Sequence, residues 1–239
     1  MEISKTADQA LVLLLCLADR GTQTPIELAR VTGLNRTVVH RLLATLHARG
    51  FVVKRGDRFG PGPVLLRLAG QFEPTLRAVA RGVMGELSDR LGETLVLAVR
   101  EDAQVVIVEQ AVAAGHLVRV QYELGYRHAV TRGASGLALL AFLPAADVDA
   151  ILAEADDAAQ LRRKLADVRA VGYATTHDEL RAGAWGLAAP VRDGDGAAIA
   201  SLSVVVPTTR IAGADYAEPV LDAAERIGKQ LTATAPAAG

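Results

Sequence analysis

Cysteine is nearly absent from this chain of 239 residues, which contains one, Cys16. A single cysteine excludes an internal disulfide bond, and nothing in the sequence supports a zinc site. Cys16 falls in a stretch where apolar residues recur at helical spacing. We therefore expect Cys16 to be a small core residue rather than a redox sensor, on a buried helical stripe marked by Ala7, Leu11, Leu14, Leu15 and Ala18.

Long apolar runs are also missing, although 51% of the residues are hydrophobic. No run reaches the roughly 18 residues of a membrane-spanning helix, and the N-terminus lacks the charged-then-apolar pattern of a signal peptide. We expect a cytoplasmic protein without a membrane partner. His116, His128 and His177 fall in predicted turns, and no two histidines have the i, i+4 spacing of a helical metal pair. The sequence predicts no metal site and no cofactor.

A strong net charge is absent too, because the formal charge at pH 7 is −1. The distribution is uneven: residues 1–70 hold ten lysines and arginines against five acidic residues, which leaves 16 against 22 in residues 71–239. A basic end on a nearly neutral chain is what electrostatic attraction to DNA requires. Together with the length, this split favours two domains.

Residues 24–35 specify the start and end of a first short helix. Thr24 and Glu27 have the spacing of a capping box, and Pro25 stands at the first helical position, where proline is tolerated best. Gly33 supplies the left-handed residue that ends the helix, and Asn35 is a favoured N-cap for the next one. We predict two short helices joined by a tight turn.

The second helix has an apolar side and a polar side, and a basic hairpin follows it. Four residues of a 3.6-residue wheel form the apolar side: Val39, Leu42, Leu43 and Leu46. Beyond Gly50 the pattern changes to alternation, and residues 55–58 close a hairpin. This order is that of a winged helix-turn-helix, so we predict DNA contacts from Asn35, Arg36, Thr37, His40 and Arg41 in the helix and from Lys54, Arg55 and Arg58 in the wing.

The alternative is a small helical subdomain with a solvated charged face, and the charge distribution argues against it. After the wing, helices are predicted at residues 63–70 and 75–92, with a domain boundary at residues 71–74, because Pro74 biases its predecessor away from helix. Further strands are predicted at 94–99, 105–111 and 117–122, helices at 135–143, 145–153 and 161–171, strands at 172–175, 185–191 and 198–206, and a last helix at 215–232. Strands, then helices, then strands, then a helix describe an α+β domain with an antiparallel sheet.

The chain resembles the IclR (isocitrate lyase regulator) family of transcriptional regulators over nearly its whole length. Four segments carry the resemblance: GLNRTVVHRLLATLHARGFV at 33–52, FGPGPVLLRLA at 59–69, GASGLALLAFLP at 133–144 and GLAAPVRDGDGAAIASLSV at 186–204. The resemblance implies a C-terminal GAF-like domain that binds a small-molecule effector. Members act as repressors or activators on palindromic operators in double-stranded DNA, usually as homodimers or dimers of dimers (homotetramers). We expect a DNA-binding domain at 1–70, a connecting helix at 71–92, the GAF-like domain at 93–233 and a disordered tail at 234–239.

By the same resemblance, the effector-binding residues are Gly133, Ala134, Ser135, Ala184, Gly186, Ser203 and Val205, and Trp185, which lies beside them in the sequence, is a further candidate. The sequence departs from the family pattern here, because Gly186 replaces a cysteine of some members, Val205 a second serine and Thr176 an acidic residue. Unpaired polar groups are costly to bury, so these losses favour a larger, less polar ligand over a small carboxylate. Trp185 has two interpretations, a pocket wall or a core or interface filler. Arg132 is interpreted as a solvated loop residue, in preference to a partner for an anionic effector.

Effector-modulated, sequence-specific DNA binding has two alternatives, an enzyme and a constitutive DNA-binding protein. An enzyme would have to use Ser135, but residues 133–136 (GASG) lack the G-x-S-x-G spacing of a nucleophile elbow, and a role as helix N-cap suffices for Ser135. We predict no catalytic residue. A constitutive DNA-binding protein whose C-terminal domain only oligomerises is the other alternative, and it would show no effect of a ligand on DNA affinity or on thermal stability.

Overall fold

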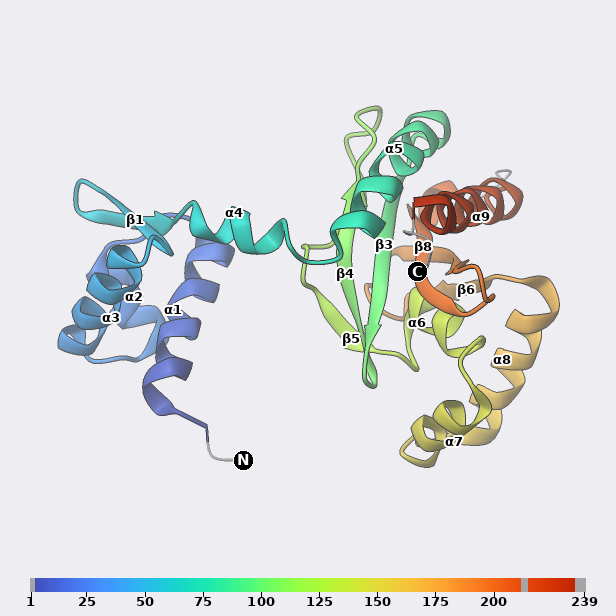
Figure 1. Cartoon of the computed structure of the whole chain (residues 1–239), viewed down its shortest axis with the longest axis horizontal. Coiled ribbons are helices and arrows are strands. Elements are labelled where there is room, and N and C mark those ends of the chain that lie inside the picture. Colours follow the sequence, from blue (N-terminus) through green and yellow to red (C-terminus); the bar gives the residue numbers. More distant parts are fainter. Residues whose placement is uncertain (1–2, 212–214, 235–239) are drawn as a thin grey trace. The chain divides into compact units, whose positions relative to one another are not determined.

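The chain divides into two compact units, residues 1–74 and 75–239, in a computed structural model that describes residues 3–211 and 215–234 (Figure 1). Each unit has its own hydrophobic core. The disordered tail expected at 234–239 lies outside the described residues, except for Thr234, which ends the last helix. Within the described ranges, no helix is long and apolar enough to cross a membrane.

Over residues 3–74, the first unit consists of three helices, a two-stranded wing and one further short helix. The helices are α1 (Lys5–Arg20), α2 (Pro25–Thr32) and α3 (Arg36–Ala48), the wing is formed by β1 (Val52–Arg55) and β2 (Arg58–Pro61), and α4 (Val64–Ala69) follows. The strands are antiparallel with Arg55 opposite Arg58. Gly56 takes a φ of +64° in the turn between them, which costs glycine little. The predicted winged helix-turn-helix is confirmed.

The buried stripe predicted on α1 is wrong in its choice of face. Cys16 is buried, but its core neighbours on α1 are Leu13 and Leu17, whereas Leu11 and Leu15 are 59% and 64% exposed. Residues 11–17 (LVLLLCL) are apolar on every side of the helix, so spacing alone does not select the buried face. Contacts with α2 and α3 select it.

A six-stranded antiparallel sheet forms the centre of the second unit. Its strands are β3 (Thr94–Glu101), β4 (Gln104–Ala111), β5 (Arg127–Ala129), β6 (Ala174–His177), β7 (Ala184–Arg192) and β8 (Ala198–Pro207). Their spatial order is β5-β4-β3-β8-β7-β6. The register of β3 on β4 shifts where Leu97 faces Glu109 and Ala98 faces Ile107, which makes Val108 an extra residue, as in a β-bulge.

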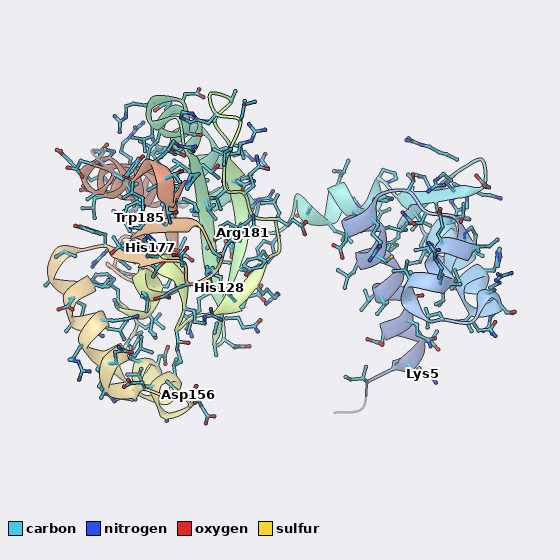
Figure 2. All side chains as sticks on the ribbon, turned by 180° about the vertical axis from the view of Figure 1, so that it is seen from behind. Lys5, His128, Asp156, His177, Arg181 and Trp185 are labelled. Carbon is cyan, nitrogen blue, oxygen red and sulfur yellow. The ribbon has the colours of Figure 1, made fainter. Side chains whose placement is uncertain are left out.

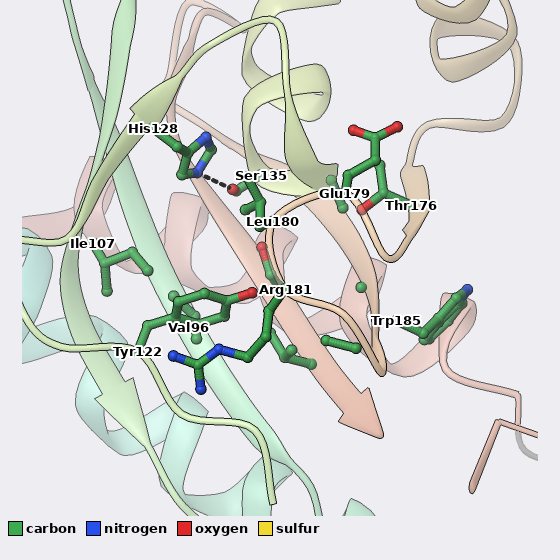
Figure 3. A pocket seen from close by; sticks show the side chains of 15 residues that line it. Val96, Ile107, Tyr122, His128, Ser135, Thr176, Glu179, Leu180, Arg181 and Trp185 are labelled. Carbon is green, nitrogen blue, oxygen red and sulfur yellow. Dashed lines mark hydrogen bonds between the residues drawn. The ribbon is translucent and has the colours of Figure 1, made fainter. Parts of the chain in front are cut away.

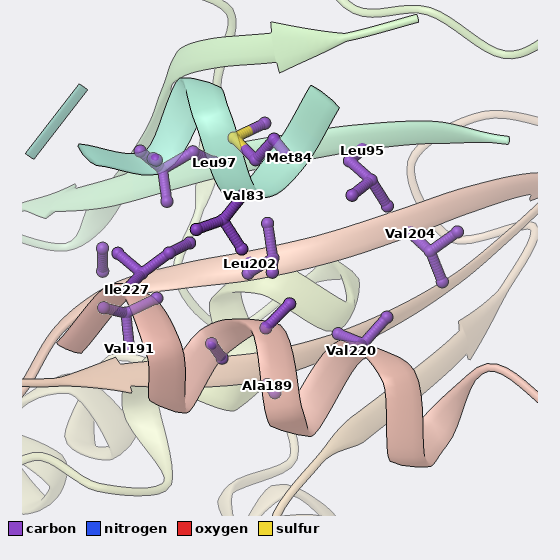
Figure 4. Close-up of a cluster of buried hydrophobic side chains, with 14 of the residues drawn as sticks. Val83, Met84, Leu95, Leu97, Ala189, Val191, Leu202, Val204, Val220 and Ile227 are labelled. Carbon is purple, nitrogen blue, oxygen red and sulfur yellow. The ribbon is translucent and has the colours of Figure 1, made fainter. Parts of the chain in front are cut away.

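Helices cover both faces of this sheet. The core on one face includes α5 (Pro74–Leu91) and α9 (Ala217–Thr234), and the core on the other face includes α6 (Gly133–Leu140), α7 (Ala145–Ala153) and α8 (Ala158–Val171). Successive strand residues alternate between the two cores: Leu95 and Leu97 pack with α5 and α9 (Figure 4), and Val96 and Ala98 pack on the other side. A short 3₁₀ helix, η1 (Thr208–Arg210), follows β8. The predicted α+β class with an antiparallel sheet is confirmed.

The strand predicted at residues 117–122 does not form, and the sheet takes β5 at Arg127–Ala129 instead. Side chains bind the backbone of this segment: Gln110 Oε1 accepts from Tyr122 N at 2.9 Å, and Arg210 Nη1 donates to Val118 O at 2.7 Å. These bonds satisfy backbone groups that a strand would pair in a ladder. Of the alternating apolar residues, Val120 is buried and Tyr122 is half-buried, whereas Val118 is 69% exposed, so the alternation does not indicate strand pairing here.

Two smaller predictions are also wrong. His128 and His177, expected in turns, lie in β5 and β6. Ser135, expected to cap α6, is the third residue of that helix, because the backbone N–H of Gly133 already finds an acceptor in Glu179 Oε2 at 2.9 Å. The other predicted helices and strands lie within three residues of their observed ends.

Candidate functional site

The orientation of α3 is fixed by caps at the turn before it. Thr24 Oγ1 accepts from Glu27 N at 3.2 Å, and Glu27 Oε2 accepts from Thr24 N at 2.8 Å, which completes the capping box. Gly33 has a left-handed φ of +69° after α2, and Asn35 Oδ1 accepts from Thr37 N at 2.9 Å. The start of α3 is therefore defined by side-chain hydrogen bonds as well as by packing.

The two sides of α3 differ as predicted, because its four apolar-side residues are buried in the core of the first unit. The exposed residues near its N-terminus are Arg36, Thr37, His40 and Arg41, and Asn35 is exposed just before it. Side chains at this end of a recognition helix reach base edges in the major groove. Arginine has the paired donors that read guanine.

In the wing, Lys54 and Arg55 are exposed, whereas Arg58 is engaged within the unit. Arg58 Nη2 lies 2.8 Å from Thr22 O and 3.0 Å from Glu27 Oε2. The hydrogen bond from the Thr24 backbone, and to a smaller extent the charge of Arg58, lowers the pKa of Glu27 below its ordinary value of 4.5. Arg58 therefore connects the wing to the start of α2.

The second unit contains a cavity between the sheet, the start of α6 and the loop from β6 to β7 (Figure 3). Of the residues predicted to bind an effector, seven line it: Ala134, Ser135, Ala184, Trp185, Gly186, Ser203 and Val205. Gly133 lies against Leu180, since a Cβ at Gly133 would come within 2.5 Å of Leu180 Cδ1. The cavity volume is about 40 Å³, which is room for a few water molecules.

A serine and a histidine form one polar part of the cavity wall. His128 Nε2 lies 3.1 Å from Ser135 Oγ, and His128 Nδ1 lies 2.9 Å from Ala129 O. Because a carbonyl oxygen only accepts, we assign the imidazole proton to Nδ1, and Nε2 then accepts from the Ser135 hydroxyl. Burial, with a smaller contribution from the charge of Arg132, lowers the pKa of His128 below its ordinary value of 6.5. The imidazole is therefore neutral at pH 7.

A hydrogen bond between serine and histidine is also part of a catalytic triad. Here the partner of His128 Nδ1 is a backbone carbonyl and not a carboxylate. Ser135 lies within the first turn of α6, and no nucleophile elbow presents it. The contact serves as a fixed pair of hydrogen-bonding groups in the wall.

Ser203 is a further polar residue that lines the cavity. It is 4% exposed, and its Oγ is itself buried and has no hydrogen-bond partner among the described residues. A buried hydroxyl without a partner costs stability. A ligand therefore reaches Ser203 Oγ only if the wall around it opens.

Charged side chains flank the cavity at two places. Glu179 accepts from Gly133 N through Oε2, and its Oε1 lies 3.2 Å from Lys164 Nζ, while Arg132 donates to the Glu179 carbonyl. Arg181 is exposed, and its guanidinium carbon lies 5.4 Å from the centroid of the Tyr122 ring. Within the part of the chain that the structure describes, no carboxylate pairs with Arg181.

Trp185 lines the cavity and also packs outside it. Its ring centroid lies 5.7 Å from that of Tyr216, and it contacts the core beneath α5 and α9. In Figure 3 the indole points away from Tyr122 and His128. Trp185 is therefore both a wall residue of the cavity and a core filler, so the two interpretations are compatible.

Several cavity residues were not predicted from the sequence: Val96, Ile107, Tyr122, His128, Glu179, Leu180 and Arg181. His128, Arg181 and Trp185 come from β5, the β6–β7 loop and β7 (Figure 2). Loops contribute most of the polar members, and their course depends on tertiary contacts that leave no local pattern in the sequence. In residues 3–211 and 215–234, no three His, Cys, Asp or Glu side chains are grouped closely enough to hold a metal ion.

Comparisons with known proteins find matches for both units. The family model for the IclR helix-turn-helix domain matches residues 6–56, and the model described as bacterial transcriptional regulator IclR C-terminal matches residues 73–229. The chain is 30% identical to the HTH-type transcriptional regulator BhcR of Paracoccus denitrificans, over 93% of this chain and 86% of the relative.

Solved structures are similar over almost the full length. A putative transcriptional regulator from Rhodococcus sp. RHA1 superimposes with a TM-score of 0.82 at 24% identity and covers 98% of this chain and 100% of its own. An IclR homologue from Microbacterium hydrocarbonoxydans, complexed with 4-hydroxybenzoate, superimposes with a TM-score of 0.81 at 26% identity and covers 96% of this chain and 100% of its own.

Proposed function

The chain belongs to the IclR family of DNA-binding transcriptional regulators, and on this premise we propose that a small-molecule effector bound in its second unit changes its affinity for a palindromic operator. The observation that carries the proposal is the cavity in the second unit, which brings together seven of the eight residues predicted to bind an effector.

On the DNA side, we assign base contacts to Arg41 and Thr37, on the exposed side of α3. Arginine donates two hydrogen bonds to O6 and N7 of guanine. Arg36, His40 and Asn35 lie at the same end of the helix and reach the neighbouring bases or phosphates.

The wing adds phosphate contacts from Lys54 and Arg55, which fix the register of the protein on the duplex. Arg58, the remaining predicted contact, has to leave Glu27 and Thr22 to reach a phosphate. We therefore expect it to contribute less than Lys54 and Arg55.

On the effector side, the cavity favours a ligand with an apolar body and few polar groups. Apolar side chains supply most of the wall, and Ser135 and Ser203 supply hydroxyls. The similar protein from Microbacterium hydrocarbonoxydans was crystallised with 4-hydroxybenzoate, which has an apolar ring of this kind. A cavity of about 40 Å³ is smaller than such a ring, so binding requires the cavity to widen.

A chain of contacts supports a route from the cavity to α5, the helix that follows the first unit in sequence. Ile107 of β4 lines the cavity. Glu109 lies two residues further along β4, beyond the bulge, and is 7% exposed. Glu109 Oε2 lies 2.7 Å from Arg81 Nε and 3.3 Å from Arg77 Nε, both on α5. We propose that a shift of β4 on ligand binding moves α5 and so changes the separation of two recognition helices.

A palindromic operator implies two copies of the chain, and we propose a homodimer or a dimer of dimers in the cytoplasm, where the operator is accessible. Recognition helices of a dimer read half-sites about one DNA turn apart, or a multiple of it. The rival function, constitutive DNA binding with a second unit that only oligomerises, gives no role to this cavity. We also propose that the pair of His128 and Ser135 has no catalytic role, because the partners of His128 among the described residues are the Ala129 carbonyl and the Ser135 hydroxyl, and neither is a carboxylate.

The test is selection of duplexes from a randomised DNA pool by the full chain, followed by fluorescence anisotropy titrations at two salt concentrations. A selected palindrome that binds more tightly than a scrambled duplex supports the proposal. If each subunit of a dimer makes about three phosphate contacts, the logarithm of the DNA-binding constant should fall with the logarithm of the salt concentration, with a slope of roughly −5. Failure to enrich any sequence would contradict the assignment of an operator.

A further inference from the structure

An anionic ligand group that enters the cavity meets two sources of positive potential, the N-terminus of α6 and the guanidinium of Arg181. A helix N-terminus is ordinarily an anion site. In this chain the carboxylate of Glu179 occupies it, with Oε2 2.9 Å from Gly133 N and Oε1 3.2 Å from Lys164 Nζ. A ligand anion at this position would have to break both contacts and lie next to a second negative charge.

Arg181 is the alternative partner for the anionic group of a ligand. Its guanidinium carbon lies over the Tyr122 ring, 5.4 Å from the ring centroid, and no carboxylate pairs with it among the described residues (Figure 3). A cation–π contact is not a hydrogen bond, so it leaves the N–H groups of the guanidinium for other partners. Those groups form the planar fork that binds a carboxylate in bidentate geometry.

Hydroxyl groups provide the partners for the other end of a ligand. Ser203 Oγ is buried without a partner among the described residues. Ser135 donates its proton to His128 Nε2 and keeps lone pairs that accept from a ligand O–H or N–H. Valine and isoleucine side chains form the wall on β3, β4 and β8, at Val96, Ile107 and Val205.

We propose that Arg181 is the residue that selects an anionic ligand, and that this ligand binds with its anionic group at Arg181 and its opposite, hydrogen-bonding end at Ser203 and Ser135. The inference rests on the effector binding proposed above and adds the charge and the orientation of the effector. The ligand class is a monoanion with an apolar body the size of one ring and a hydroxyl or amide at its far end.

The experiment compares acids with their neutral amides on the full chain by titration calorimetry. The probes are 4-hydroxybenzoate with 4-hydroxybenzamide, and 4-hydroxyphenylacetate with 4-hydroxyphenylacetamide. At least one acid is expected to bind about tenfold more tightly than its amide. Arg181→Gln is expected to weaken that acid about tenfold and to leave the amide within about twofold, and Arg181→Lys to recover part of the loss, because lysine keeps the charge without the fork.

Two further variants test the orientation. Arg132→Gln is the matched control. Arg132 is exposed like Arg181, but it lies at the start of α6 and donates to the Glu179 carbonyl. This variant should leave acid binding unchanged. Glu179→Gln should change acid binding by less than about threefold, since the anion is at Arg181. If Glu179→Gln tightens acid binding tenfold while Arg181→Gln has no effect, the anion binds at α6 and the proposal is overturned.

Failure of this inference is separable from failure of the proposed function. Equal binding of acid and amide, or binding of neither acid, overturns the selection of anions by Arg181. A neutral compound that stabilises the chain and changes its DNA affinity would overturn it too, while leaving effector-modulated DNA binding intact. Operator binding by the same variants without ligand reports on the DNA-binding surface alone.

Discussion

His128 Nε2 and Ser135 Oγ lie 3.1 Å apart and join β5 to α6 in the wall of the cavity. Both residues are 8% exposed. His128 is held from its other side by the Ala129 carbonyl at Nδ1. The pair therefore links the local stability of the second unit to the protonation of one imidazole.

Acidification should destabilise the second unit through His128. Burial, and less strongly the charge of Arg132, lowers the pKa of His128 below 6.5, so the unfolded chain binds a proton that the native state does not. Stability is therefore fully present above the ordinary pKa and is lost as the pH falls from there through the native pKa. His128→Gln should flatten the pH dependence of the free energy of unfolding, followed by the fluorescence of Trp185, the only tryptophan. Identical slopes in the two proteins would count against this account.

Ser203 and Ser201 form a matched pair on β8. Both hydroxyls are buried without a partner among the described residues, and only Ser203 lines the cavity. Replacing either with alanine should leave the free energy of unfolding unchanged or raise it by up to about 1 kcal/mol, because an unpaired hydroxyl is removed. Calorimetry with a ligand that stabilises the wild type should show weaker binding for Ser203→Ala alone. An equal loss for Ser201→Ala would mean that the cavity does not hold the ligand.

Gly136 allows α6 to lie close to the chain before it. A Cβ at Gly136 would lie 2.5 Å from the Val130 carbonyl oxygen, whereas a Cβ at Gly85 of α5 would meet no atom within 4 Å. Gly136→Ala should therefore destabilise the second unit by about 1–3 kcal/mol through overpacking. Gly85→Ala should be neutral or stabilising by up to about 1 kcal/mol, as expected for alanine in a helix. Urea unfolding curves of both variants test the contrast, and similar midpoints would refute it.

Arg41→Ala should weaken operator binding by about 1–3 kcal/mol and relax specificity at one base pair in each half-site. Arg49, exposed at the C-terminal end of α3, lies away from the end that reaches the bases, and Arg49→Ala is expected to have a smaller effect. Anisotropy titrations against the selected operator and its single-base variants separate the two. If Arg41→Ala weakens binding to all sequences equally, Arg41 contacts a phosphate.

Local sequence signals predicted the first unit well, because its turns depend on residues with defined backbone roles. Thr24 with Glu27, Gly33, and the hairpin turn at Gly56 each restrict the chain within a few residues. The signal failed on α1, where Leu11 and Leu15 are as apolar as Leu13 and Leu17 but lie on the exposed side.

The cavity was predicted only in part, and the missing part follows from long-range contacts. The resemblance indicated Ser135 and Ser203, which lie on regular elements. Tyr122 belongs to a segment whose backbone is bonded by Gln110, and Glu179 reaches a helix start 46 residues earlier in the chain. Neither relationship has a signature in local spacing, because each depends on which loop lies against which strand or helix.

The most direct test of the central claim is operator affinity measured by anisotropy with and without a stabilising ligand, in the wild type and in Gly186→Val. Gly186 lines the cavity, and a Cβ there makes only ordinary contacts, the nearest at 3.6 Å from Ala134 Cβ, so the Cβ of valine fits and its methyl groups reduce the space for a ligand. The account predicts that ligand changes wild-type affinity by about fivefold or more, and that Gly186→Val still binds the operator without responding to ligand. A ligand that raises the wild-type Tm but leaves its operator affinity unchanged would contradict the account and favour constitutive DNA binding.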